Sequence, residues 1–389
     1  MNPINLIQGV FSRKAFIDWI LIIPVVIIVV FGLITMSTFV NENLFFEKQI
    51  ISFGVAIVVF FITTRIDTDV FKQTNMLVLL FVSVSALLII LLGLGHTVKG
   101  SQSWFKIGLF AFQPVDVMKL LLVIILAKYF SRRHVEIAHF RHIIVSGVYA
   151  LIPFILVLLQ PDFGSAMIIF FIWLGMVLVS GVSKKHLVLV FFIAVIIFGV
   201  SWGKLLKPYQ KARIITFVNP LSDIRGAGYN VYQSTIAVGS GQIIGKGAGY
   251  GTQSRLRFLP EYQTDFIFSA FAEEWGFIGV IIIFALFIII IGRILMIAFI
   301  GTTNFEILYG AGIAISIIIP FLINIGMTIG ILPVAGIALP FMSFGGSHLI
   351  MEFAALGFLV SMKKNTRTSH RSTLENEFSG GGPKIIDNR

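Results

Sequence analysis

The chain has 389 residues, of which 57% are apolar and only 12% are charged, and its mean hydropathy is +0.97. A soluble domain has about 25% charged residues, so membrane-embedded helices are the only ordinary explanation of this composition. The absence of cysteine excludes disulfides, thiolate metal sites and a cysteine nucleophile. Basic loops of a membrane protein explain the net charge of +11 better than nucleic acid, which we do not expect as a partner.

Apolar runs follow one another along the chain, each close to the roughly 20 residues that a membrane-crossing helix needs. The first is too long for the core of a signal peptide, so we interpret it as a retained span. The sequence predicts an all-α polytopic membrane protein with about ten transmembrane helices. These are centred on residues 15–39, 49–64, 75–95, 114–130, 142–160, 164–181, 185–202, 266–292, 306–331 and 344–362.

Basic side chains fall on one side of the membrane if these spans alternate in direction, and the positive-inside rule makes that side cytoplasmic. They are Arg13, Lys14, Arg132, Arg133, Arg141, Lys184, Lys185, Arg293, Lys363, Lys364, Arg367 and Arg371. We therefore expect a multi-pass membrane protein with both termini in the cytoplasm. Residues 1–362 form its transmembrane domain, and the polar residues 363–389 are predicted to be a disordered cytoplasmic tail.

One long polar segment, about 203–265, separates the seventh and eighth predicted spans and is therefore expected to be extracytoplasmic. It is rich in glycine, cationic, aromatic and amide residues, and it ends at Asp265. A carboxylate at a membrane surface that faces a basic loop suits chemistry on an anionic, lipid-linked substrate. The stretch GSGQIIGKGAGYGTQS can present backbone N–H groups to an anion, but it lacks the phosphate-loop pattern.

Ionisable side chains inside predicted spans are costly, so each is a candidate for function, with a structural pair as the alternative. Lys119 lies one turn after Asp116, which indicates either an intrahelical ion pair or a cation that lines a phosphate cavity. Asp162 is either a turn former or a partner of Lys119 or of another cation. The adjacent Glu273 and Glu274 point about 100° apart, so they need different partners, and we expect one to pair with a basic group.

Three further polar residues of the spans have ordinary structural explanations. Lys48 begins a span, where a lysine commonly extends to the membrane surface. Glu352 lies well inside the last span and must face protein. Asn324 is expected to bridge helices through its amide.

Four stretches closely resemble the SEDS family of shape, elongation, division and sporulation proteins. They are QPVDVMK at 113–119, QPDFGSA at 160–166, the whole segment Tyr209–Glu274, and NIGMTIGILPVAGIALPFMSFGGS at 324–347. With the pattern of spans, the resemblance covers residues 10–362. The sequence GKG…GTQS…FLPE is similar to the RodA branch, whereas the FtsW and SpoVE branch usually carries SRQK…YLPE.

The resemblance implies a peptidoglycan glycosyltransferase of the bacterial inner (plasma) membrane that polymerises lipid II into glycan strands during cell-wall elongation and cell-shape maintenance. The implied partners are lipid II, the growing glycan chain, a class B penicillin-binding protein (the transpeptidase) and other membrane proteins of the elongation complex. No cofactor is required by the resemblance, which leaves assistance by a divalent cation open.

The family's essential loop acid falls on Asp265, which we expect to act as general base, with inversion at the anomeric carbon. The candidate substrate-binding residues are Lys119, Asp162, Lys48, Lys211, Arg213, Lys246, Glu261 and Ser343. Two other functions compete with this hypothesis: a lipid II flippase, and a non-catalytic scaffold for the transpeptidase. An aspartate at the outer mouth of a span favours the enzyme, because a flippase needs cavity residues at both leaflets.

Several positions depart from the family's usual pattern. Ser103 stands where an arginine commonly precedes Trp104, and Lys99 or Lys106 would have to replace that phosphate contact. The other departures are Asp116 for glutamate, Phe344 for tyrosine, Ala338 for proline, and the atypical His348 and Glu352. They bear on substrate binding rather than on Asp265.

Overall fold

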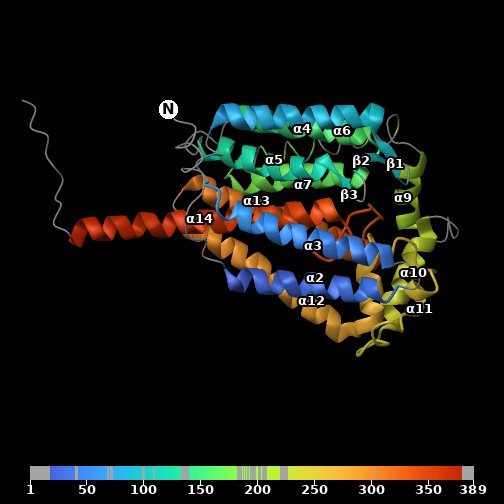
Figure 1. Cartoon of the computed structure of the whole chain (residues 1–389). Coiled ribbons are helices and arrows are strands. Elements are labelled where there is room, and N and C mark those ends of the chain that lie inside the picture. Colours follow the sequence, from blue (N-terminus) through green and yellow to red (C-terminus); the bar gives the residue numbers. More distant parts are fainter. Residues whose placement is uncertain are drawn as a thin grey trace, which may run out of the picture.

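The computed structural model (Figure 1) describes residues 18–39, 43–67, 70, 73–98, 101–107, 110–132, 140–181, 208–219, 227–301 and 303–378, and scattered positions between 186 and 203. The described chain is mostly helical. Its longer helices are α2 (Trp19–Ser37), α3 (Asn43–Thr63), α4 (Thr74–Leu94), α5 (Pro114–Ser131), α6 (Phe140–Leu159), α7 (Phe163–Val179), α12 (Ile267–Ile300), α13 (Asn304–Thr328) and α14 (Gly346–Phe378).

These helices form one bundle, in which α13 packs against α5, α7 and α12, α12 packs against α2, and α14 packs against α3. Three shorter helices, α9 (Pro208–Val218), α10 (Ala227–Ser240) and α11 (Thr252–Arg255), gather at one end of the bundle (Figure 1). The described part of the predicted polar loop therefore contains three helices, and they lie at the end of the bundle opposite to the one from which α14 projects.

A mostly helical protein is confirmed, and six described helices are long and apolar enough to cross a bilayer. Two further apolar helices, Phe163–Val179 and Gly346–Met362, are shorter. The count of ten spans stays a prediction, since most of the run 185–202 lies outside the described residues. Helix α5, which covers the fourth predicted span, contains the charged residues Asp116, Lys119 and Lys128.

Local sequence signals explain where several helices begin. Pro114 occupies the first turn of α5, where its missing N–H costs nothing. The carboxylate of Asp162 accepts a hydrogen bond from the backbone N–H of Ser165 (3.0 Å) and so caps α7. Thr303 and Glu306 form a capping box at the start of α13.

A small antiparallel sheet between α4 and α5 was not anticipated from the sequence. Its strands β1 (His96–Val98), β2 (Ser101–Ile107) and β3 (Phe110–Phe112) pair in the order β1-β2-β3. Ser103, the residue in the place of the family's arginine, is buried in β2. Of its suggested replacements, Lys106 lies in the same strand, and Lys99 falls outside the described residues.

The end of the chain differs from the prediction of a tail without structure. Helix α14 continues to Phe378, well past the last predicted span, and leaves the bundle (Figure 1). Residues 363–378 contain neither proline nor glycine, so nothing stops the helix from propagating out of its apolar part. Residues 379–389 lie outside the described residues, where the prediction of disorder stays a prediction.

Candidate active site

Asp265 lies immediately before Phe266, the N-cap of α12, and its side chain is partly exposed. The side-chain amide of Asn324 on α13 donates hydrogen bonds to the carbonyl oxygens of Asp265 (2.9 Å) and Ile337 (2.7 Å). A Cβ atom built on Gly336 would lie 3.5 Å from Asp265 Oδ2, so the carboxylate faces the segment that follows α13. Asn324 therefore joins the backbone of Asp265 to that segment.

The segment that follows Ile337 holds the residues just before Asp265 at two further points. Ser343 Oγ donates a hydrogen bond to the carbonyl oxygen of Thr264 (2.7 Å) and accepts one from the N–H of Leu339 (2.8 Å). The N–H of Phe344 donates to the carbonyl oxygen of Gln263 (2.9 Å). Because the Ser343 hydroxyl both donates and accepts within the protein, the geometry favours a positioning role for it over the predicted contact with substrate.

Glu261 shapes the turn that leads into Asp265. Its carbonyl oxygen accepts hydrogen bonds from the N–H groups of Thr264 and Phe266, both at 3.1 Å. Its carboxylate accepts a hydrogen bond from Thr264 Oγ1 (3.1 Å), and its backbone has a φ of 53°. A non-glycine residue in this conformation is uncommon and is held there by such contacts.

Asp162 lies near the same segment but does not reach Lys119. Besides capping α7, its carboxylate accepts a hydrogen bond from Gln113 Nε2 (3.2 Å). A Cβ on Gly164 would meet the carbonyl oxygen of Ala335 at 2.6 Å, so the start of α7 packs directly on the segment beside Asp265. Asp162 thus helps to build one wall of the candidate site.

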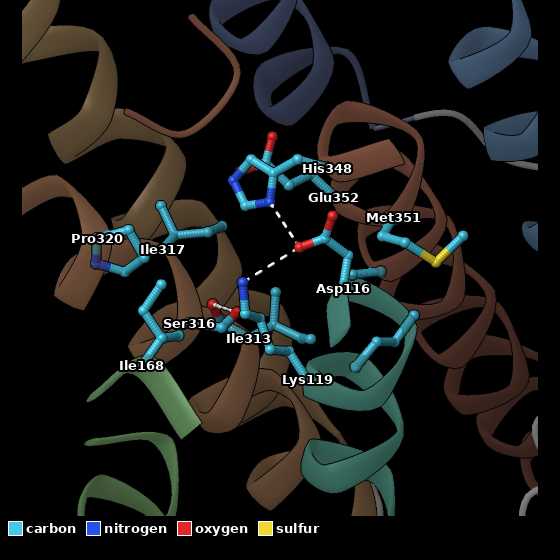
Figure 2. Close-up of a pocket in the computed structure, with 12 residues that line it drawn as sticks. Asp116, Lys119, Ile168, Ile313, Ser316, Ile317, Pro320, His348, Met351 and Glu352 are labelled. Carbon is cyan, nitrogen blue, oxygen red and sulfur yellow. Dashed lines mark hydrogen bonds and ion pairs between the residues drawn. The ribbon is translucent and has the colours of Figure 1, made fainter. Parts of the chain in front are cut away.

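Lys119 forms the intrahelical pair that its spacing suggested: its ammonium lies 3.1 Å from Asp116 Oδ1. His348 Nδ1 lies 3.4 Å from the same oxygen, and His348 Nε2 lies 3.1 Å from Glu352 Oε1. Figure 2 shows His348 and Lys119 converging on Asp116. The cavity beside them, between α5, α7, α13 and α14, has a volume of about 50 Å³, which suits a few water molecules and not a lipid-linked sugar.

Lys246 is held by a carboxylate of the protein, which removes the main reason to assign it to a pyrophosphate. Its ammonium lies 2.6 Å from Glu273 Oε1, while the same oxygen accepts a hydrogen bond from the N–H of Thr252 (2.8 Å). The N–H of Gln253 donates to Glu273 Oε2 (3.1 Å). The expected pairing of one of the two glutamates with a basic group is thereby confirmed.

The glycine-rich stretch does present N–H groups to anionic and carbonyl oxygens, but those oxygens belong to α12. The N–H groups of Lys246 and Gly247 donate to the carbonyl oxygens of Glu273 (3.0 Å) and Glu274 (2.9 Å). The N–H of Gly249 donates to the Glu274 carboxylate (3.0 Å), which also accepts from Thr38 Oγ1. A phosphate-binding role for these three N–H groups has no support in the structure.

Helix α12 is interrupted at Gly276, whose φ of 63° and ψ of −166° are not helical. The N–H groups of Phe277 and Ile278 donate to the carbonyl oxygens of Gln242 (2.8 Å) and Ile243 (3.1 Å) instead of to the preceding helical turn. A Cβ on Gly276 would lie 2.2 Å from the backbone nitrogen of Gly245, so only glycine fits. The loop thus replaces the hydrogen bonds that the interruption removes.

The remaining candidate residues lie farther from these contacts. Lys48 is half-buried on α3, next to Gln49, whose side chain contacts the backbone of Ser343 (3.2 Å). Lys211 and Arg213 lie on α9, and Arg213 lines a small hollow beside Gly330. The structure therefore brings Asp265, Ser343, Glu261 and Asp162 to one segment, whereas Lys119 and Lys246 are paired with Asp116 and Glu273.

Sequence reasoning noted His348 and Glu352 without giving either a partner. Their i, i+4 spacing on one helix was the available signal. Within the described residues, no group of three or more His, Cys, Asp or Glu side chains is arranged to hold a metal ion.

Comparison with known proteins gives a consistent set of relatives. A family model described as "Cell cycle protein", covering FtsW, RodA and SpoVE, matches residues 12–368. The chain is 32% identical to the peptidoglycan glycosyltransferase MrdB of Escherichia coli K12, over 93% of this chain and 98% of that one. It is 33% identical to the stage V sporulation protein E of Bacillus subtilis, over 92% of this chain and 99% of that one.

Solved structures show the same architecture. One similar structure is a chain from a study of the structural coordination of polymerization and crosslinking by a peptidoglycan synthase complex. Its TM-score is 0.77 at 27% identity, and the match covers 90% of this chain and 98% of that one. The rod shape determining protein RodA of Thermus thermophilus is similar with a TM-score of 0.67 at 25% identity, covering 90% and 97%.

Proposed function

Because this chain belongs to the FtsW, RodA and SpoVE family of cell cycle proteins, we propose that Asp265 is the general base of a reaction that polymerises lipid II. The chain is a membrane-embedded peptidoglycan glycosyltransferase, the activity for which its relatives are named. The observation that carries the role of Asp265 is its combination of a partly exposed carboxylate with a backbone fixed from α13 and from residues 343 and 344.

In the proposed reaction, the hydroxyl oxygen of one sugar attacks the anomeric carbon of a second sugar. The Asp265 carboxylate accepts the proton of that hydroxyl as the new bond forms. The bond from that carbon to the lipid pyrophosphate breaks, and the pyrophosphate leaves with the electron pair. One displacement inverts the anomeric centre and converts an α-linked donor into a β-linked glycan. Fixing the carboxylate in advance lowers the entropic part of the barrier, and proton transfer adds about 100-fold or more.

The pyrophosphate needs positive charge nearby, since charge develops on it as it leaves. Lys211 and Arg213 on α9 are the best placed of the candidate cations, because α9 lies at the same end of the bundle as the start of α12 (Figure 1). Lys48, on α3, is a third candidate. The protein's own residues supply this positive charge in the proposal, and no required cofactor enters it.

The proposed orientation of the protein in the membrane follows from the difference between the two ends of the bundle. In the proposed topology α9, α10 and α11 lie outside the cell, and α14 projects into the cytoplasm, as the distribution of basic residues predicts. A reporter fused after Arg371 should then be active only in the cytoplasm, and one inserted near Gly249 only outside.

The cellular role in the proposal is cell-wall elongation with a class B penicillin-binding protein as the crosslinking partner. Its support is the similarity to a chain of a peptidoglycan synthase complex and to RodA.

The decisive experiment uses purified protein in liposomes with labelled lipid II. We expect glycan polymer without translocation of unpolymerised lipid II. Translocation without polymer would replace the proposal by a flippase, and neither product would indicate a scaffold.

A further inference from the structure

A side chain of α14 reaches back to the segment beside Asp265. Glu352 Oε2 accepts a hydrogen bond from the backbone N–H of Phe341 (2.9 Å), while Glu352 Oε1 lies 3.1 Å from His348 Nε2. One carboxylate therefore serves two partners, a backbone group and a side chain of its own helix. The Glu352 side chain is only 10% exposed, so its contacts form largely away from water.

The backbone at Phe341 needs such support. Its φ of 61° is a left-handed conformation that a bulky non-glycine residue rarely adopts, and its side chain is 1% exposed. Strained conformations of this kind persist only where several contacts fix them. The contacts here are the hydrogen bond to Glu352 and an edge-on ring contact with Phe353 (centroids 6.3 Å apart).

In the chain, Phe341 lies between Leu339 and Ser343, which are joined by a hydrogen bond. Ser343 Oγ accepts a hydrogen bond from Leu339 N–H and donates one to the carbonyl oxygen of Thr264, the residue before Asp265. A change in the backbone at 341 therefore moves the atoms that locate Thr264. The path from Glu352 to Asp265 consists of two hydrogen bonds and two short stretches of backbone, 341–343 and 264–265.

The other end of this path is anchored in α5. His348 lies between Glu352 and Asp116, and Asp116 also holds Lys119 (Figure 2). Two carboxylates and two basic groups meet there, which balances their charges when His348 is protonated. The cluster thus fixes the position of the Glu352 carboxylate from two sides.

We infer that Glu352, oriented by His348, is a positioning residue for the glycosyl transfer, acting through Phe341 and Ser343 on the backbone of Asp265. This inference rests on the proposed role of Asp265 as general base. Glu352 itself touches no reacting atom in this scheme. Its loss should displace the base and so reduce turnover, because a displacement of about 1 Å can cost up to 100-fold in rate.

The alternative is a purely structural role, in which Glu352 only holds α14 against the rest of the bundle. Tyr309 provides a matched control for this alternative, since its buried hydroxyl donates a hydrogen bond to the carbonyl oxygen of Ala355 on α14 (2.9 Å). Tyr309→Phe removes a buried link between α13 and α14 without touching the segment 339–344. It should leave turnover unchanged.

The experiment combines kinetics on lipid II in liposomes with hydrogen exchange of the peptide that contains residues 339–345. Glu352→Leu removes both contacts while keeping bulk, and Glu352→Gln keeps an oxygen that can accept from Phe341 N–H. For Glu352→Leu we expect faster exchange of this peptide and a fall in kcat of about tenfold or more, with KM changed less than about twofold. Glu352→Gln should restore most of the turnover.

If Glu352→Leu folds poorly, Ser343→Ala interrupts the same path one step later and should give the same split between kcat and KM. Unchanged exchange of the 339–345 peptide, or a normal kcat in Glu352→Leu, would overturn the inference. An equal fall in kcat in Tyr309→Phe would do the same. The exchange measurement does not depend on which residue is the base. If Asp265→Asn were active while Glu352→Leu showed faster exchange, the proposed role of Asp265 would be refuted, but the structural link from Glu352 to the segment 339–345 would stand.

Discussion

Asp265 and Glu273 are two carboxylates on one stretch of chain, and the structure treats them in opposite ways. Glu273 is 0% exposed, and its oxygens accept hydrogen bonds from the Lys246 ammonium and from two backbone N–H groups of the loop. Asp265 is partly exposed, and its backbone is fixed by Asn324 and, through Thr264, by Ser343.

The difference distinguishes an acid that stabilises the fold, Glu273, from the proposed base, Asp265. A carboxylate that is fully buried and surrounded by donors stabilises the fold, and it cannot take up a proton from substrate without breaking those contacts. A carboxylate whose backbone is fixed and whose side chain reaches solvent can accept a proton in a defined place. Position in the sequence alone made both acids candidates for function, and only the resemblance to the SEDS family singled out Asp265.

The largest effect on activity is expected at Asp265. Asp265→Asn keeps the shape of the side chain but removes its basicity, so polymerisation in liposomes should fall by about 100-fold or more. The thermal unfolding midpoint should stay close to that of the unchanged protein. Near-normal polymer yield from this variant would reject the catalytic assignment.

Glu273→Ala should instead act on stability. Breaking a buried ion pair by removing one partner costs about 3–5 kcal/mol, and we expect the lower end because the Lys246 side chain is 30% exposed. Thermal unfolding in detergent measures the loss. Lys246→Met is the matched control, with a smaller cost, since several backbone donors to Glu273 remain. A Glu273→Ala variant that is stable but inactive would show that Glu273 also serves activity, which contradicts its assignment as a structural acid.

A smaller effect is expected at the Lys119 pair. Lys119→Met leaves Asp116 buried with one partner fewer and should reduce activity about tenfold, the order of a lost charged hydrogen bond. The double variant Asp116→Asn with Lys119→Met removes both charges and should regain most of that activity. If the double variant stays as inactive as the single one in the lipid II assay, Lys119 contacts substrate, as its position in the motif first suggested.

The smallest effect is expected from removing the end of the chain. Truncation after Asn365 removes the part of α14 that leaves the bundle (Figure 1) and that lies beyond the last predicted span. Polymerisation and unfolding temperature should both stay unchanged. A loss of polymerisation would mean that this helix serves the transmembrane domain.

The positions of the long helices could be predicted from the sequence because apolar runs of span length leave few alternatives. The Asp116–Lys119 pair could be predicted as well, since it depends only on helical spacing. The sheet β1-β2-β3 could not, because its strands are short and lack clear alternation.

Contacts between distant segments escaped prediction for a different reason. Glu352 binds a backbone N–H that is exposed to it only because Phe341 takes a left-handed conformation. Lys246 finds Glu273 only because the glycine-rich loop folds back onto α12. Neither partner is marked by residue type or spacing, so each required the three-dimensional path of the chain.

The interruption at Gly276 limits how much of α12 the hydrocarbon core has to hold. The 34 residues of α12 would span about 51 Å as one straight helix, far more than the roughly 30 Å of a hydrocarbon core. The part after Gly276, residues 277–300, is about 36 Å long and so is long enough to cross that core alone. In the proposed topology Glu273 and Glu274 then lie outside the hydrocarbon, and Asp265 lies up to about 15 Å farther along the chain, where the proposed reaction requires it to meet a sugar joined to a lipid through pyrophosphate.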